Sequence, residues 1–471
     1  MTDNDSETQP AQSGAAVRQG LIAVACLASA AAGAYAIGNG SPSLEPAAVR
    51  AMFILLLAAS LWVTDVVPAF AVGILVIALK IALLGRPQGV FAETSKDWEA
   101  FVAVLGHPLV WLFFGGFVLA AGMQKCGLDQ LIAVRLLGRF GKRPGAVLLG
   151  VMCVTFVLSM FISNTATTAM MLAILSPLVA SADRSDRFTT GLLIGCAVAA
   201  NLGGMGSLIG TPPNAIAVGA LAERGMTISF LQWMWLGLPP AIASLLIAWG
   251  LLLWLFPTAR TEIDTSAEMP SLKGRGPRDW RRWVVSLTLG ATLLMWLSSQ
   301  WHGIPTAAVG FLPIVVFTTL GVLSSEDIRG LSYDVLFLLA GGLALGQTLA
   351  ETGLSDWLVG LLPIDSLGPL ATVALLALAT VALSNVMSNT AAANVIVPIG
   401  VSAAAGFEPQ AAVAIAFGAS AAMCLPVATP PNAMVYSTGK CRAADFLTIG
   451  LAMGLVAPSL GIAWLRLVLP T

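Results

Sequence analysis

The sequence predicts an all-α polytopic membrane protein, and three observations support that prediction. Only 10% of the 471 residues are charged, whereas a typical soluble domain has roughly 25%. Hydrophobic residues make up 57% of the chain, and the mean hydropathy is +0.88. Apolar runs close to the ~20 residues that cross a bilayer recur along nearly the whole chain. A water-soluble fold is therefore excluded, and a net charge of -1 offers no basic face for nucleic acid.

The N-terminal region predicts a flexible polar tail followed by a membrane span. Residues 1–16 include Asp3 and Asp5 and bury too little apolar surface to order themselves. Residues 20–36 also resemble a cleaved signal peptide, but the segment before them is acidic, and Arg18 is its one basic residue. We favour an uncleaved span, which opens an N-terminal scaffold region at residues 17–106.

The apolar pattern predicts eleven transmembrane helices and two re-entrant hairpins. Each hairpin consists of two apolar halves on either side of a Ser-Asn-Thr sequence, and each half is too short to cross the bilayer. The hairpins occupy residues 146–180 and 369–403, and a charged cytoplasmic linker occupies residues 257–282. The spans lie at about 20–36, 49–66, 69–86, 107–128, 188–222, 229–256, 284–300, 306–323, 333–352, 411–437 and 445–468.

The distribution of lysine and arginine predicts the orientation, because cytoplasmic loops retain these residues. A cytoplasmic N-terminus with eleven crossings places most of the 23 basic residues inside. The loops that flank the second hairpin, residues 353–369 and 403–410, contain no basic residue. The first hairpin is therefore expected to enter from the cytoplasm, and the second from outside.

Three motifs occur twice, in the same order and at nearly the same separation. By the predicted topology, the first copy begins on an inward span and the second on an outward span. We therefore expect two inverted repeats, at 107–256 and 331–471, joined through connecting spans within residues 283–330. Inverted repeats with broken helices are typical of secondary transporters. The pairs are Gly115-Gly116 with Gly341-Gly342, Ser163-Asn164-Thr165 with Ser388-Asn389-Thr390, and Thr211-Pro212-Pro213-Asn214 with Thr429-Pro430-Pro431-Asn432.

The Thr-Pro-Pro-Asn motifs predict broken helices at 210–214 and 428–432. Each proline removes a backbone donor and clashes with the preceding turn, so the helix stops before it. Thr211 and Thr429 are then expected as N-caps, with Pro212 and Pro430 at the first position of the next half-helix. Together with the hairpin tips, four helix breaks should converge.

The convergent breaks suit a small cation and an anion. Carbonyls at helix C-termini attract a hard cation, and amides at helix N-termini attract an anion. No Arg, Lys, His, Asp or Glu lies in the motifs, so they offer no titratable carrier for a proton. Sodium needs only neutral oxygens. The motifs therefore favour sodium-coupled uptake of an anion.

The paired motifs resemble the divalent anion/sodium symporter family, whose members carry dicarboxylates, citrate or sulfate. The resemblance covers nearly the whole chain after the tail and extends to residues 111–117, 203–205 and 425–428. It implies an elevator-like motion, in which hairpins and broken helices slide against a dimeric scaffold, and it implies a homodimer in the lipid bilayer of a bacterial inner membrane. Two departures are Ser384, where threonine is common, and Asp65, which replaces a glutamate.

The same resemblance implies ligands for sodium ions and for the anion. In the first repeat, sodium would be held by Ser159, Ser163, Asn164 and the backbone of Gly210. In the second repeat, it would be held by Ser384, the backbone of Met387, Asn389 and the backbone of Ala428. The substrate would contact Ser163, Asn164, Thr165, Thr211, Pro212, Ser388, Asn389, Thr390, Thr429 and Pro430.

Several alternatives remain open at this point. A membrane enzyme is disfavoured because the chain lacks the H-E-x-x-H and G-x-S-x-G motifs. A channel would not need cation ligands on two hairpins, and a proton-coupled or exchange carrier is the alternative among transporters. Two facing Ser-Asn-Thr motifs favour a C4-dicarboxylate such as succinate, malate or fumarate, with sulfate as the second candidate. Outside the motifs, the paired glycines indicate close helix packing, Lys80 is expected to reach the membrane interface, and Asp65 has a capping or a functional role.

Overall fold

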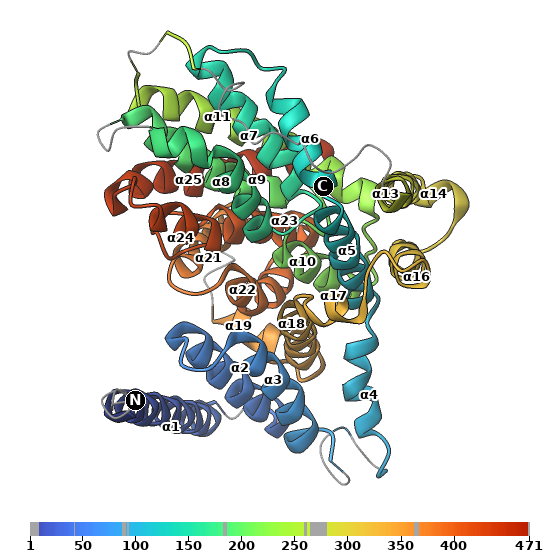
Figure 1. Ribbon diagram of the computed structural model, residues 1–471. Helices are drawn as coiled ribbons and strands as arrows, with labels where there is room; N and C mark the ends of the chain where they lie inside the picture. Colours follow the sequence, from blue (N-terminus) through green and yellow to red (C-terminus); the bar gives the residue numbers. More distant parts are fainter. Residues whose placement is uncertain are drawn as a thin grey trace, which may run out of the picture.

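The computed structural model describes residues 9–41, 43–86, 91, 94–181, 186–258, 261–263, 280–361 and 367–469. Within these ranges every regular element is a helix (Figure 1). In the described part of the chain, seven helices are long and apolar enough to cross a membrane, and six shorter apolar helices accompany them. The prediction of an all-α polytopic membrane protein is confirmed.

The first half of the chain begins with one long helix at the edge of the molecule, beside α2 (Figure 1). This helix starts at Gln9, inside the tail that we expected to be flexible up to residue 16, because its alanine- and glutamine-containing sequence favours a helix. Residues 1–8 of that tail lie outside the described part. The helices are α1 (Gln9–Gly40), α2 (Pro46–Thr64), α3 (Ala69–Leu83), α4 (Trp98–Val102), a 3-10 turn (Ala103–Gly106), α5 (Pro108–Lys125), α6 (Leu128–Leu137), α7 (Pro144–Ser159), α8 (Asn164–Ser181), α9 (Arg187–Met205), α10 (Pro212–Ala222) and α11 (Phe230–Leu255).

The second half repeats this order from α18 onward. Most of the predicted linker, residues 259–260 and 264–279, lies outside the described part, and α13 begins at Trp280. The helices are α13 (Trp280–Leu297), α14 (Ser299–His302), α15 (Thr306–Val309), α16 (Phe311–Thr319), α17 (Ser325–Arg329), α18 (Tyr333–Glu351), α19 (Leu354–Gly360), α21 (Pro369–Ser384), α22 (Asn389–Ala403), α23 (Glu408–Ala421), α24 (Pro430–Ser437) and α25 (Ala443–Val468).

The two hairpins are pairs of short helices joined by a four-residue turn. Helix α7 ends at Ser159 and α8 starts at Asn164, while α21 ends at Ser384 and α22 starts at Asn389. Each first helix packs against the incoming half of the broken helix in its own repeat, α7 on α9 and α21 on α23. Sixteen residues span about 24 Å at 1.5 Å per residue, less than the ~30 Å of a hydrocarbon core. These lengths suit helices that stop within the membrane.

Paired glycines bring helices of the two halves into backbone contact. A Cβ at Gly115 would lie 2.3 Å from the carbonyl oxygen of Gly310, and a Cβ at Gly341 would lie 2.2 Å from the Cα of Gly73. The expectation of close packing is therefore confirmed. Helix α5 of the first half thus packs against α15 and α16 of the second half, and α18 of the second half packs against α3 of the first half. The two halves are therefore packed against each other through these helices.

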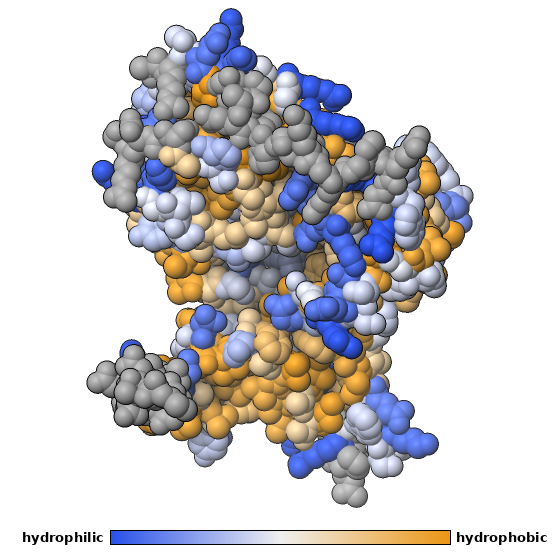
Figure 2. All heavy atoms as spheres, in the orientation of Figure 1, coloured by the Kyte–Doolittle hydropathy of each residue, from blue (hydrophilic) through white to orange (hydrophobic). Residues whose placement is uncertain are grey.

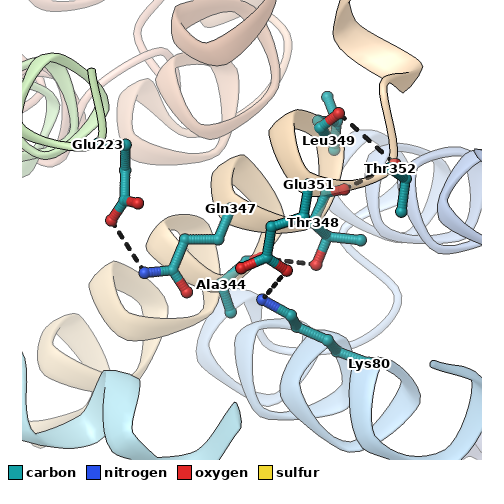
Figure 3. A network of polar contacts seen from close by, with 8 residues as sticks. All are labelled: Lys80, Glu223, Ala344, Gln347, Thr348, Leu349, Glu351 and Thr352. Carbon is teal, nitrogen blue, oxygen red and sulfur yellow. Dashed lines mark hydrogen bonds and ion pairs between the residues drawn. The ribbon is translucent and has the colours of Figure 1, made fainter. Parts of the chain in front are cut away.

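Two ion pairs involve the last residues of α5 and α18. Lys125 pairs with Asp327 of α17, and Glu351 pairs with Lys80 of α3 at 3.1 Å (Figure 3). The expectation that Lys80 reaches the membrane interface is wrong, because its side chain is 2% exposed and points to the carboxylate at the end of α18. Nearby, Gln347 of α18 donates to Glu223 at the end of α10 at 2.9 Å (Figure 3).

Candidate functional site

Four helices begin at the wall of one cavity near the middle of the molecule. They are α8, α10, α22 and α24, two from each half of the chain. The cavity has a volume of about 560 Å³, within the usual range for small-molecule sites. Figure 2 shows the surface hollowed at mid-height, where Figure 1 places α22 and α10, with pale and blue residues in the hollow. The wall includes all ten residues predicted for the substrate: Ser163, Asn164, Thr165, Thr211, Pro212, Ser388, Asn389, Thr390, Thr429 and Pro430.

The two hairpin tips have the same hydrogen bonds. Ser159 Oγ lies 2.7 Å from Asn164 Oδ1 and 2.8 Å from the carbonyl oxygen of Ala200. In the other half, Ser384 Oγ lies 2.9 Å from Asn389 Oδ1 and 3.0 Å from the carbonyl oxygen of Ala419. Each serine is fully buried behind the asparagine that lines the wall. The duplicated motif therefore builds the same geometry twice.

Each of these triplets has more oxygens than protons. A serine hydroxyl has one proton, which it can donate to only one acceptor at a time. The asparagine oxygen and the backbone carbonyl both lie within reach of that proton, so one oxygen is always left without it. Neutral oxygens at the C-terminus of a helix suit a hard cation such as sodium. Among the described residues, no group of three or more His, Cys, Asp or Glu side chains could hold a metal ion.

The residues predicted for sodium lie at these two places. Ser159 and Ser384 are buried behind the wall, and the other six line the cavity. Gly204 and Gly210 leave the room that the first triplet needs. A Cβ at Gly204 would lie 2.9 Å from Asn164 Oδ1, and a Cβ at Gly210 would lie 2.5 Å from the Gly204 oxygen. The six wall residues are Ser163, Asn164, Gly210, Met387, Asn389 and Ala428.

The Thr-Pro-Pro-Asn motifs form the expected helix breaks. Thr211 and Thr429 occupy the N-cap positions, with extended backbones and proline next in the chain. The asparagine of each motif braces the break from behind. Asn214 Nδ2 donates to the carbonyls of Gly204 and Ser207, at 2.8 and 2.7 Å, and Asn432 Nδ2 donates to two equivalent carbonyls at 3.0 Å each. The breaks are thus held open by side chains of the same motif.

The electrostatic character of the wall comes from helix ends. The N-terminus of a helix carries about half a positive charge, and four N-termini face this cavity. Asp65 is the one titratable side chain among the described residues of the wall. It is exposed, lies at the end of α2 and has a left-handed backbone conformation with φ of 50°. The arrangement can therefore bind an anion without a basic residue.

The motifs did not identify all of the wall. Phe113 and Phe117 of α5 and Trp62 of α2 add apolar surface, and Asn201 and Asn385 add two amides. Asn201 lies on α9, ten residues before Thr211, and belongs to no duplicated motif, because the other half has no counterpart asparagine. Its polar side chain within an apolar helix was the one available indication.

Comparison with known proteins finds transporters that are similar to this chain over most of its length. The model of the citrate transporter family, CitMHS, matches residues 52–412. The sodium-dependent dicarboxylate transporter SdcS of Staphylococcus saprophyticus is 29% identical over 451 residues, covering 88% of this chain and 85% of the relative. SdcS of Staphylococcus aureus strain USA300 is 28% identical over 463 residues, covering 90% and 86%. The crystal structure of the YdaH transporter of Alcanivorax borkumensis has a TM-score of 0.54 and 17% identity, covering 86% of this chain and 99% of that one.

The fold and the match define the class as a polytopic membrane transporter with paired hairpins. The chain belongs to the citrate transporter family, whose model covers most of its length. The resemblance to divalent anion/sodium symporters that the paired motifs indicated is thereby confirmed.

Proposed function

We propose that this protein is a sodium-coupled symporter of small divalent anions, with C4-dicarboxylates such as succinate, malate and fumarate as its substrates. The observation that carries the proposal is the duplicated triplet of Ser159 with Asn164 and Ser384 with Asn389, each exposing an asparagine to one shared cavity. The dicarboxylate transporters named SdcS, similar over most of their length, support the substrate class and the coupling ion.

Coupling follows from the double position of each asparagine. Its Oδ1 belongs to the oxygen triplet proposed for sodium, and its side chain lines the cavity proposed for the anion. Sodium bound at the triplet would place a positive charge beside the anion. In a site away from bulk water, that attraction amounts to several kcal/mol, about 4 kcal/mol at 4 Å and an effective dielectric constant of 20. Each ion would therefore raise the affinity for the other.

Alternating access is proposed to occur by an elevator-type movement. The moving part would comprise the hairpins and broken helices with α11 and α25, and a scaffold containing α2, α3, α5, α16 and α18 would remain fixed. Beside the hairpin residues, the cavity wall includes the α2–α3 turn and the start of α18. With a cytoplasmic N-terminus, that side is cytoplasmic. A homodimeric scaffold in a bacterial inner membrane completes the proposal.

Uptake of labelled succinate into proteoliposomes tests the proposal. We expect uptake that needs an inward sodium gradient, is competed by malate, and falls to background in Asn164→Ala and Asn389→Ala. Ser176→Ala is a matched control, because Ser176 is exposed and bonds only within α8. Sulfate uptake without succinate uptake would overturn the proposed substrate but not the proposal that the protein is a transporter. Uptake that is indifferent to sodium, or that proceeds only against a counter-substrate, would overturn the coupling.

A further inference from the structure

One polar bond crosses between the two halves at the cavity wall. Asn201 of α9 donates from Nδ2 to Thr429 Oγ1, the N-cap hydroxyl of α24, at 3.1 Å. Asn201 is 1% exposed and Thr429 is 2% exposed, and both line the cavity. The bond therefore joins the broken helix of the first half to that of the second, directly at the proposed substrate site.

The hydrogen bonds at Thr429 determine where its proton points. The Thr429 oxygen also accepts from the backbone N–H of Asn432, at 3.3 Å. A hydroxyl oxygen has two lone pairs and one proton. Two N–H donors occupy both lone pairs of Thr429 Oγ1, so its hydroxyl proton must point away from both donors. No described residue accepts a hydrogen bond from this proton. Because Thr429 lines the cavity, that proton is available to an anion.

The equivalent position in the first half lacks this arrangement. Thr211 is the N-cap of α10, but its hydroxyl accepts no capping bond. Ala200 and Ala419 are equivalent, since the two buried serines reach their carbonyls, so the residue that corresponds to Asn201 is Ser420. Ser420 donates to Ala416 in its own helix at 3.0 Å. One of the two N-cap threonines is therefore oriented by a partner, and the other makes no side-chain capping bond.

We propose that Asn201 is a positioning residue that fixes the Thr429 hydroxyl as a hydrogen-bond donor to the transported anion. This inference rests on the proposed function. A donor oriented in advance loses less rotational freedom on binding, and a hydrogen bond to a charged acceptor is stronger than one between neutral groups. The other amide atom of Asn201, Oδ1, is buried and has no hydrogen-bond partner among the described residues. A buried polar atom without a partner is unfavourable, and this indicates that the surrounding structure holds Asn201 in place.

A double-mutant cycle in succinate uptake tests the inference. We expect Asn201→Leu, close in size but without a donor, to raise KM about five- to twenty-fold. Thr429→Val should have a similar effect, and the double variant should be no worse than the poorer single variant. Thr429→Ser, which keeps the hydroxyl, should stay within about two-fold of the wild type. In combination with Thr211→Val, the effect of Asn201→Leu should multiply.

Controls separate positioning from folding. Ser420→Ala removes the equivalent buried hydroxyl and should leave KM unchanged. Asn201→Ala serves if the leucine variant does not fold, which thermal melting of the purified protein in detergent reports. The shift in Tm caused by succinate gives the same cycle without a sodium gradient.

The outcomes distinguish this inference from the proposed function. Multiplicative effects of Asn201→Leu and Thr429→Val, or an unchanged KM in Asn201→Leu, would overturn the positioning role. Succinate uptake or binding that does not need sodium would overturn the coupling, while the cycle would still report on Asn201. If the wild type binds sulfate instead of succinate, the same cycle is measured with sulfate.

Discussion

The two halves of the protein have the same polar geometry and different packing. Each hairpin tip places a buried serine within 2.7–3.0 Å of an asparagine and a carbonyl. In the second half, however, α22 packs against α18, and Asn394 donates to the Leu338 carbonyl at 3.4 Å. In the first half, α5 packs mainly on α15 and α16, and its Phe113 and Phe117 face the cavity.

This difference separates the residues that would bind the ions from the contacts that would open or close a path to them. The bonds that would select ions are conserved between the halves, whereas the contacts that open or close a path are not. One hairpin is held against its neighbouring long helix, and the other is separated from it by the cavity. We interpret this asymmetry as one of the two states that the proposed alternating access requires.

Removing the buried serines should have the largest effect, and an equal one in both halves. Ser159→Ala and Ser384→Ala each leave an oxygen triplet with one ligand fewer. We expect the sodium concentration for half-maximal uptake to rise at least about ten-fold in each. Sodium titrations of succinate uptake measure this. A loss in one variant alone would show that the equal geometry does not mean equal function.

The glycines that precede the hairpins should differ in their sensitivity. A Cβ at Gly342 would lie 1.7 Å from Asn394 Oδ1 and 2.2 Å from its Cγ, so Gly342→Ala must displace the whole amide group that bonds to Leu338. At Gly116 the nearest atom is Ile209 Cδ1, at 3.2 Å, which can move. We expect a cost of about 2–3 kcal/mol for Gly342→Ala and less than about 1 kcal/mol for Gly116→Ala.

Melting temperatures of the purified variants test this difference. Asn394→Ala should restore much of the stability lost in Gly342→Ala, because it removes the side chain that clashes. Equal losses in the two glycine variants would mean that α18 and α5 are packed alike, contrary to the asymmetry described above.

Substitutions in the ion pair at the end of α18 should have a smaller effect on stability. Glu351→Gln leaves the Lys80 ammonium without its partner, and Lys80 is 2% exposed. Lys80→Met removes the buried charge itself, and its partner is 49% exposed and can be hydrated. We expect Glu351→Gln to destabilise by about 1–2 kcal/mol and Lys80→Met to be nearly neutral. Melting temperatures that rank the two variants in the opposite order would contradict this reasoning.

The pair at the end of α5 should show the smallest effect, and one that depends on pH. The Lys125 ammonium and Ser324 lower the pKa of Asp327 to about 2, from an ordinary value of 3.8. A lowered pKa contributes stability above about pH 4, and that stability is lost as the pH falls toward 2. Because both side chains are partly exposed, we expect less than about 1 kcal/mol. The difference in Tm between wild type and Asp327→Asn should be present at pH 6 and shrink as the pH falls from about 4 through 2.

The sequence was most informative where a feature depends on local chemistry. Proline and Ser-Asn-Thr signals located the hairpin turns, and the second hairpin begins and ends at the predicted residues 369 and 403. The N-cap positions of Thr211 and Thr429 followed from the prolines beside them. Such signals act within one turn of helix, so no tertiary information is needed.

Features that depend on distant residues were not predictable. The partner of Lys80 lies 271 positions away, at Glu351, so no local pattern favoured burial of Lys80 over a position at the membrane interface. Asn201 and Thr429 are likewise in different halves, and only the fold brings them together. The start of α1 at Gln9 was not predicted for another reason. The polar composition of residues 9–16 indicated a flexible tail, but alanine and glutamine in the same segment favour a helix.

The neutral oxygen triplets determine how transport should depend on pH. Hydroxyls, amides and carbonyls do not titrate between pH 5 and 8, so sodium affinity should be constant over that range. The fraction of a dicarboxylate that carries two charges does change as the medium becomes acidic. In Asp65→Asn, which removes the one titratable side chain on the described wall, the pH profile of transport should therefore report the ionisation of the cargo and not that of the carrier.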